Sequence, residues 1–168
     1  LFDRVHTLKK EIEKEKITTG TVVILEADFS PTALALLLVL IDLGCIIVPL
    51  TSSVASQKEE FIKIAEGEVL IKLDDDDNLK TSKTSHKVSH EFINELKDRG
   101  HPGLVLFSSG STGKSKASLS DFSDILNKFK VPRHSLRTIA FLLFDHIGGI
   151  NTLLYTLSNA GCVVAIND

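Results

Sequence analysis

The sequence has 168 residues, of which 43% are apolar and 24% charged, and its formal net charge is −3. This composition favours a folded globular domain over a disordered chain. Nucleic-acid binding requires clustered excess Lys and Arg, so the negative charge argues against a nucleic-acid partner. The longest apolar run, residues 33–50, is interrupted by Asp42, Gly44 and Pro49. We therefore expect a buried helix followed by a buried strand there, and no membrane span.

Two cysteines, Cys45 and Cys162, lie in separate apolar runs and form no Cys-x-x-Cys pair. We expect both to be buried, reduced thiols, which is consistent with a cytoplasmic protein.

Apolar runs alternate with amphipathic segments along the whole chain. Ser30 and Pro31 supply a helix cap and a proline at the first helical position. Strands separated by helices predict an α/β fold with a mostly parallel sheet flanked by helices, here as a single domain over residues 1–168. The expected helices are 9–16, 32–43, 53–65, 91–99, one beginning near 122, and 150–157, and the expected strands are 21–25, 45–49, 69–73, 104–107, 139–144 and 161–166.

Residues 74–89 are rich in Asp, Lys, Ser and Thr and lack apolar periodicity, which predicts a polar loop. The loop begins with four consecutive aspartates, residues 74–77. Four adjacent carboxylates cannot converge on one ion from an extended loop, so we expect a solvated loop and no metal site.

The most informative segment follows the apolar run 104–107. The next nine residues, 108–116, contain only Ser, Thr, Gly and Lys. Glycines allow the backbone to approach a ligand, successive N–H groups form an anion nest, and lysine adds positive charge. The segment therefore predicts a polyphosphate-binding loop at the carboxyl end of a strand, where open α/β sheets bind ligands.

One alternative is a Walker A loop, because Gly113, Lys114 and Ser115 match its end. Residues 139–145 would then supply a Walker B strand that ends at Asp145. Against this reading, Ser108 stands where the first Walker glycine belongs. The apolar helical period also begins only at Phe122, after a possible capping box from Ser118 to Asp121. A P-loop NTPase remains the alternative function.

A second candidate motif follows the apolar run 139–144. His146 and Gly149 are separated by two residues, and an amphipathic stretch follows at 150–157. We expect this run to neighbour the phosphate-loop strand in the same sheet, with Gly148 and Gly149 leaving room for a ligand. The alternative is that His146 only caps a helix.

The phosphate loop resembles the signature of the adenylate-forming (AMP-binding) superfamily, which includes acyl-CoA synthetases and peptide-synthetase adenylation domains. Phe107 to Gly113 match the family pattern throughout, and Lys116 falls where the family lysine falls. Ser115 replaces the usual proline and Ala117 the usual glycine. The resemblance implies that the loop contacts phosphate through Ser108, Ser109, Gly110, Ser111, Thr112, Gly113 and Lys116. It also implies catalytic roles for Lys116 and for His146, which would border the acyl site.

The resemblance carries further expectations about the whole enzyme. It implies activation of a carboxylic acid with ATP and Mg²⁺, then thioester formation with coenzyme A or with phosphopantetheine on an acyl carrier protein. Family members have several hundred residues. The downstream adenine and ribose motifs and the C-terminal domain with its lysine do not occur in this sequence, so we expect an N-terminal fragment that is inactive alone. A non-catalytic nucleotide-binding module is a further alternative.

Overall fold

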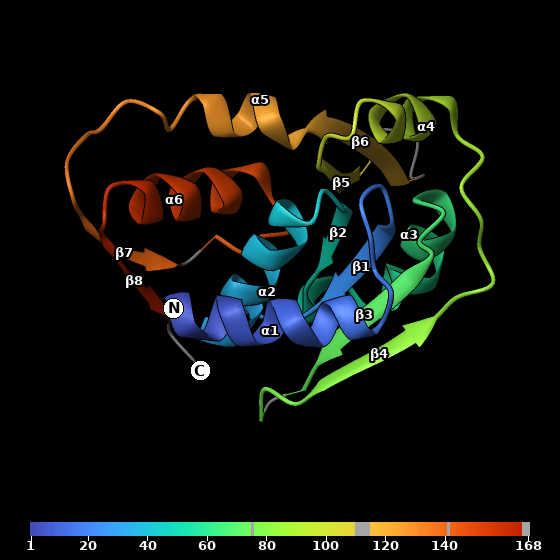
Figure 1. Ribbon diagram of the computed structural model, residues 1–168, viewed down its shortest axis with the longest axis horizontal. Helices are drawn as coiled ribbons and strands as arrows, with labels where there is room; N and C mark the ends of the chain where they lie inside the picture. The colour runs from blue at the N-terminus through green and yellow to red at the C-terminus, as the bar shows by residue number, and fades with distance from the viewer. Residues whose placement is uncertain (75, 110–114, 141, 166–168) are drawn as a thin grey trace.

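The computed structural model describes residues 1–74, 76–109, 115–140 and 142–165, and Figure 1 shows their arrangement. Six strands form one sheet in the order β4-β3-β1-β2-β5-β6, and β7 and β8 form a second sheet. The strands are β1 (Val22–Glu26), β2 (Ile46–Leu50), β3 (Val69–Leu73), β4 (Leu79–Lys83), β5 (Gly103–Ser109), β6 (Ser115–Asp121), β7 (Arg137–Ala140) and β8 (Cys162–Ala165). The helices are α1 (Phe2–Lys14), α2 (Pro31–Asp42), the 3₁₀ helix η1 (Ser52–Gln57), α3 (Lys58–Ile64), α4 (Glu91–Asp98), α5 (Phe122–Asn127) and α6 (Ile147–Ser158).

The centre of the large sheet is parallel, as the sequence predicts. Strand β1 pairs in parallel with β2 and β3, and β2 pairs in parallel with β5. Every residue of β2 is buried, as are four of the five residues of β1. Strands covered on both faces need apolar side chains at every position, which explains the unbroken apolar runs in the sequence.

Helices cover both faces of this sheet. One apolar cluster joins alternate strand residues such as Val23 and Ile47 to helices α1, α2, α5 and α6. The other joins the intervening residues, such as Val22 and Ile46, to α3 and α4. At the start of α2, the Ser30 hydroxyl accepts a hydrogen bond from the Ala33 amide, and Pro31 occupies the first turn. The predicted helix cap is therefore confirmed.

The prediction of a loop over residues 74–89 is wrong in part. Leu79–Lys83 forms β4, an edge strand that pairs antiparallel with β3. Four of its five residues are polar, so the apolar pattern of a strand is missing. Polar and charged side chains on an edge strand commonly prevent it from pairing with another chain. In the preceding turn the Asp77 carboxylate accepts hydrogen bonds from the hydroxyls of Ser30 and Thr32. This aspartate is therefore tied to the start of α2 rather than solvated.

Strands β7 and β8 pair in parallel with each other and belong to a separate sheet. The expectation that the strand before His146 neighbours the phosphate-loop strand is therefore wrong. This second sheet lies beside α6, apart from β1 to β6 (Figure 1). Strand neighbours follow from tertiary packing, so the sequence of β7 does not identify its partner.

The two cysteines differ in their surroundings. Cys45 is buried, and burial raises the pKa of its thiol to about 12. Cys162 is exposed at the start of β8, so the prediction of burial is wrong for this residue.

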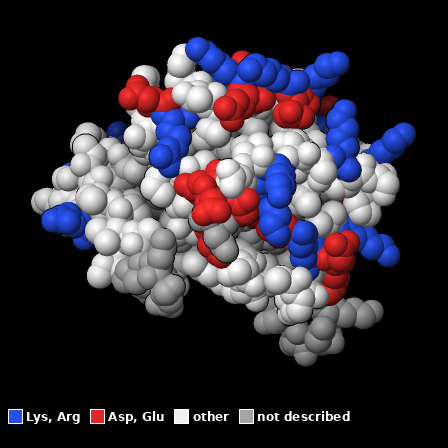
Figure 2. All heavy atoms as spheres, turned by 90° about the horizontal axis from the view of Figure 1, so that it is seen from below, with Lys and Arg blue, Asp and Glu red and all other residues white. Residues whose placement is uncertain are grey.

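None of the helices in the described residues is long and apolar enough to cross a membrane. On the face shown in Figure 2, Lys and Arg side chains are interspersed with Asp and Glu.

Candidate active site

The predicted phosphate loop joins the two strands of an antiparallel hairpin. In its register Ser108 lies opposite Lys116, and Ser109 lies opposite Ser115. Gly110, Ser111, Thr112 and Gly113, which are predicted to contact phosphate, lie outside the described residues. A Walker A loop connects a strand to a helix. Here the segment after the loop is strand β6, so the P-loop NTPase alternative is wrong.

The helix after the hairpin begins later than a capping box at Ser118 would place it. Ser118 lies within β6, and Asp121 is the cap of α5, with its carboxylate accepting a hydrogen bond from the Ser123 amide. The same carboxylate lies 2.7 Å from His101 Nδ1. Burial raises the pKa of Asp121, but the hydrogen bonds from His101 and Ser123 outweigh it and leave the pKa lowered.

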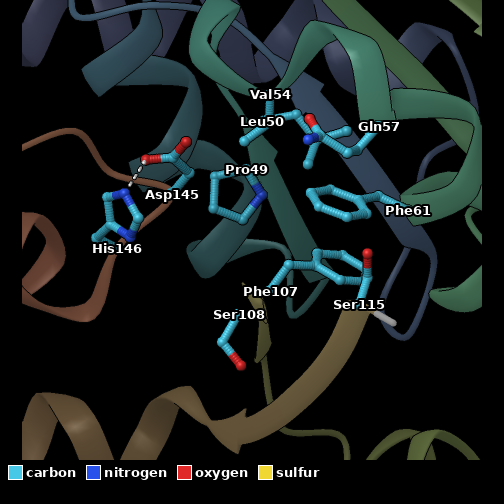
Figure 3. A pocket seen from close by; sticks show the side chains of 10 residues that line it. All are labelled: Pro49, Leu50, Val54, Gln57, Phe61, Phe107, Ser108, Ser115, Asp145 and His146. Carbon is cyan, nitrogen blue, oxygen red and sulfur yellow. Dashed lines mark ion pairs between the residues drawn. The ribbon is translucent and has the colours of Figure 1, made fainter. Parts of the chain in front are cut away.

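A pocket of about 360 Å³ lies where the hairpin arms meet the carboxyl end of β2 (Figure 3). Its apolar wall includes two stacked rings, Phe61 of α3 and Phe107 of β5, with centroids 3.9 Å apart. Asp145 and His146 lie on the opposite side. The lining residues are Pro49, Leu50, Val54, Gln57, Phe61, Phe107, Ser108, Ser115, Asp145 and His146. The pocket therefore combines an aromatic surface with hydroxyl, carboxylate and imidazole groups.

Asp145 is the most constrained polar group of this pocket, and only 6% of it is exposed. Its Oδ2 accepts a hydrogen bond of 2.6 Å from the Thr51 hydroxyl, and Ser53 Oγ lies 3.3 Å from the same oxygen. The sequence assigns Asp145 a role only in the Walker B alternative, and otherwise only as the residue before His146. The contacts with Thr51 and Ser53 span more than 90 residues. No local pattern could have revealed them.

His146 occupies the N-cap position of α6 but makes no side-chain capping hydrogen bond to the described residues. Its side chain is 61% exposed, and its Nε2 lies 3.7 Å from Asp145 Oδ1. The imidazole therefore faces the pocket beside a carboxylate. Its contacts are not those of a side chain that caps a helix.

The glycines after His146 do not both leave room for a ligand. A Cβ built on Gly149 would lie 2.0 Å from the carbonyl oxygen of Leu143. The absence of a side chain at Gly149 lets α6 pack against the preceding backbone, so this expectation is wrong. At Gly148 a Cβ would meet only the end of the Leu142 side chain, at 3.0 Å.

The structure brings together some of the predicted site residues. Ser108 and His146 line the same pocket, although they come from different parts of the chain. Lys116 is exposed and is not part of the described pocket lining. Because residues directly opposite each other in a hairpin share one face, Lys116 and Ser108 lie on the face away from Phe107 and Ser115.

A protein-family comparison decides the family. The family model described as AMP-binding enzyme matches residues 11–168. This chain belongs to the AMP-binding enzyme family. The adenylate-forming resemblance of the hairpin sequence is therefore confirmed. No protein of curated function matches the sequence at a significant level.

Several solved structures share the fold of this chain. The N-terminal subdomain of Klebsiella oxytoca NpsA in complex with anthranilyl-AMSN superposes with a TM-score of 0.73 at 18% identity, covering 97% of this chain and 45% of that one. An E. coli MenE variant with bound OSB-AMS gives a TM-score of 0.72 at 15% identity, covering 98% and 39%. An artificially fused adenylation–PCP di-domain from Klebsiella oxytoca, NpsA-ThdA, gives 0.73 at 18% identity, covering 98% and 36%. This AMP-binding chain thus spans less than half the length of these structures.

Proposed function

We propose that this chain is the N-terminal part of an enzyme that activates a carboxylic acid with ATP. A carboxylate oxygen of the acid attacks the α-phosphorus, the bond from that phosphorus to the bridging oxygen breaks, and pyrophosphate leaves. The product is an acyl adenylate. The observation that carries this proposal is the family signature on a hairpin whose strand ends, Ser108 and Ser115, line a pocket shared with His146.

The hairpin is suited to the triphosphate side of this reaction. Both reactants are anions, so catalysis depends on positioning and on positive charge where negative charge accumulates. In the proposed assignment, residues 108–113 donate hydroxyl and backbone N–H groups to phosphate oxygens. Lys116 neutralises the negative charge of the phosphates. Its side chain is exposed on the same face as Ser108 and forms no ion pair with the described residues.

The pocket is suited to the acid. Phe61 and Phe107 offer a stacked aromatic surface, and Pro49, Leu50 and Val54 extend it with apolar atoms. Such a surface would hold the body of an apolar or aromatic acid while its carboxylate lies toward His146. The relative NpsA was solved with ligands named for aryl groups, anthranilyl and 3-hydroxybenzoyl, so aryl acids are the first candidates for this site.

Mg²⁺ would enter with ATP, because this ion is usually bound by substrate phosphates together with one or two carboxylates. Among the described residues, no group of three or more His, Cys, Asp or Glu side chains is placed to hold a metal ion. For the second half-reaction we propose a thiol acceptor, either coenzyme A or phosphopantetheine on a carrier protein. The NpsA-ThdA fusion joins such a carrier domain to a related adenylation domain.

The test is ATP–pyrophosphate exchange by the full-length protein with a panel of aryl, fatty and amino acids. Exchange that depends on one class of acid is the expected result, with the 168-residue chain alone remaining at background. ATP binding without exchange for any acid would instead favour a non-catalytic nucleotide-binding module.

A further inference from the structure

A hydrogen-bond network, buried at Thr51 and Asp145, connects the loop before α6 to the end of β2. Asp145 Oδ2 accepts the Thr51 hydroxyl at 2.6 Å and lies 3.3 Å from Ser53 Oγ, and the two hydroxyl oxygens are 2.7 Å apart. Thr51 is only 2% exposed. Burial of a charged carboxylate is unfavourable unless hydrogen bonds compensate for it, so these hydroxyls determine how the carboxylate can be oriented.

The second oxygen of this carboxylate has a different environment. Asp145 Oδ1 is buried and has no hydrogen-bond donor among the described residues. The nearest ionisable group is the His146 imidazole, whose Nε2 lies 3.7 Å from it. Figure 3 shows the ring of His146 turned toward this carboxylate at one side of the pocket.

The backbone of this segment is held independently of the network. Phe144 is fully buried and packs edge-on against Phe29, with centroids 5.1 Å apart. This packing anchors the residue next to Asp145 through contacts that do not involve Thr51 or Ser53. The hydroxyls of Thr51 and Ser53 contact the side chain of Asp145, which lies beside the exposed imidazole of His146.

We infer that Asp145 is a positioning residue: Thr51 and Ser53 hold one of its oxygens, and the other holds the His146 imidazole at the pocket wall. The position of the ring rests on the 3.7 Å contact between His146 Nε2 and Asp145 Oδ1, which is longer than a hydrogen bond. The consequence for catalysis rests on the proposed function, because a ring fixed at the pocket wall binds an acid with less loss of rotamer freedom than a mobile one.

The first experiment measures the mobility of the ring and needs no substrate. The protein is labelled with ¹³C at the histidine rings, and the His146 signal is identified by its loss in His146→Gln. In the unmodified protein we expect an order parameter near that of rigid backbone, about 0.85. In Thr51→Val and Asp145→Asn we expect the order parameter to fall below about 0.6. Thr51→Ser keeps the hydroxyl and should keep the ring ordered.

A matched control separates this effect from the loss of any buried threonine hydroxyl. Thr156 is 1% exposed, and its hydroxyl forms hydrogen bonds with the Thr138 hydroxyl and the Thr152 carbonyl, away from Asp145. Thr156→Val should leave the His146 ring ordered. If Thr51→Val does not fold, Ser53→Ala replaces it in the test. Because Ser53 is exposed and makes the longer contact with Asp145, this variant should lower the order parameter of the His146 ring by a smaller amount. A ring that is mobile in the unmodified protein, or unchanged in all folded variants, would overturn the inference.

The second experiment is a double-mutant cycle in the full-length protein, using the acid of the panel that gives the fastest exchange. If Thr51 acts through His146, then Thr51→Val and His146→Ala should each raise KM for the acid, and the double variant should be no worse than His146→Ala. The coupling then equals the fold-change caused by Thr51→Val alone, up to about tenfold. Additive effects would contradict the inference even where exchange itself is observed. Absence of exchange in the unmodified protein would contradict the proposed function alone, because the ring-mobility result does not depend on it.

Discussion

The two sides of the candidate site are built in different ways. The β5–β6 hairpin carries its chemistry in consecutive residues, 108–116, and its arms are held by ladder hydrogen bonds with a register of seven residue pairs. In the segment 144–146, Phe144 packs against Phe29 of the β1–α2 connection, and the Asp145 carboxylate accepts a hydrogen bond from Thr51 at the end of β2. A site can thus be positioned by local pairing or by long-range contacts, and substitutions should affect the two sides differently.

The largest expected effect lies on the hairpin side. Lys116→Ala in the full-length protein should lower kcat/KM for ATP by about 10²–10³-fold, because one pre-organised cationic contact to the transition state is lost. Lys116→Arg should retain part of the activity, since the positive charge remains. Thermal unfolding should change little, because Lys116 is exposed on an edge strand.

Lys114→Ala is the matched control for Lys116 and should be mild, because position 114 is the variable position of the family signature. Comparison of kcat/KM for ATP in the two variants checks the assignment. The opposite ranking would mean that Lys114, and not Lys116, neutralises the phosphate charge.

The next effect lies on the other side of the site and concerns stability. Gly149→Ala places a Cβ 2.0 Å from the Leu143 carbonyl oxygen, so the start of α6 must move away from the preceding backbone. Overpacking of this kind costs about 1–3 kcal/mol, which should appear as a lower urea midpoint. Gly148→Ala is the control: its Cβ would meet only the flexible end of Leu142, at 3.0 Å, and the midpoint should barely change. Equal midpoints for the two variants would show that the packing at Gly149 is not tight.

His146 tests whether the long-range side of the site serves the acid. His146→Ala should raise KM for the acid by about tenfold, as expected for loss of one hydrogen bond to a charged group. The affinity for ATP should change little, because the triphosphate is assigned to the hairpin. Acid and ATP kinetics measured on the same preparation decide the matter. Loss of ATP binding with intact acid kinetics would place His146 on the nucleotide side.

The difference between the two sides also explains what could be predicted from the sequence. The apolar runs of β1 and β2 predict a buried parallel sheet, because both faces of those strands must be apolar. The hairpin sequence predicts a phosphate site, because glycines, hydroxyls and lysines are adjacent in the chain. Strand β4 was missed because its polar side chains give no apolar alternation, although its backbone pairs with β3.

The role of Asp145 could not be predicted for a different reason. Its role depends on Thr51, which is 94 residues away in the chain and is brought next to it by the tertiary fold. The same holds for the pairing of β7 with β8, since strand neighbours follow from tertiary packing. Residues that face a ligand can form a local motif, whereas the residues that position them need not.

The smallest expected effect lies at the base of the hairpin, where Asp121 ends β6, caps α5 and contacts His101. Asp121→Ala should lower stability at pH 7 by about 1 kcal/mol through loss of the cap.

The pKa of Asp121 is lowered in the folded state, so its charged form stabilises the fold. This contribution is present above the ordinary aspartate pKa of about 3.9 and is lost as the pH falls through the lowered folded value. The stability difference between the unmodified protein and Asp121→Ala, measured by urea unfolding, should therefore shrink as the pH falls below about 4. Asp124→Ala, an exposed change in the same helix, should show little pH-dependent difference. A difference for Asp121→Ala that is independent of pH would mean that the carboxylate charge contributes nothing at the base of the hairpin.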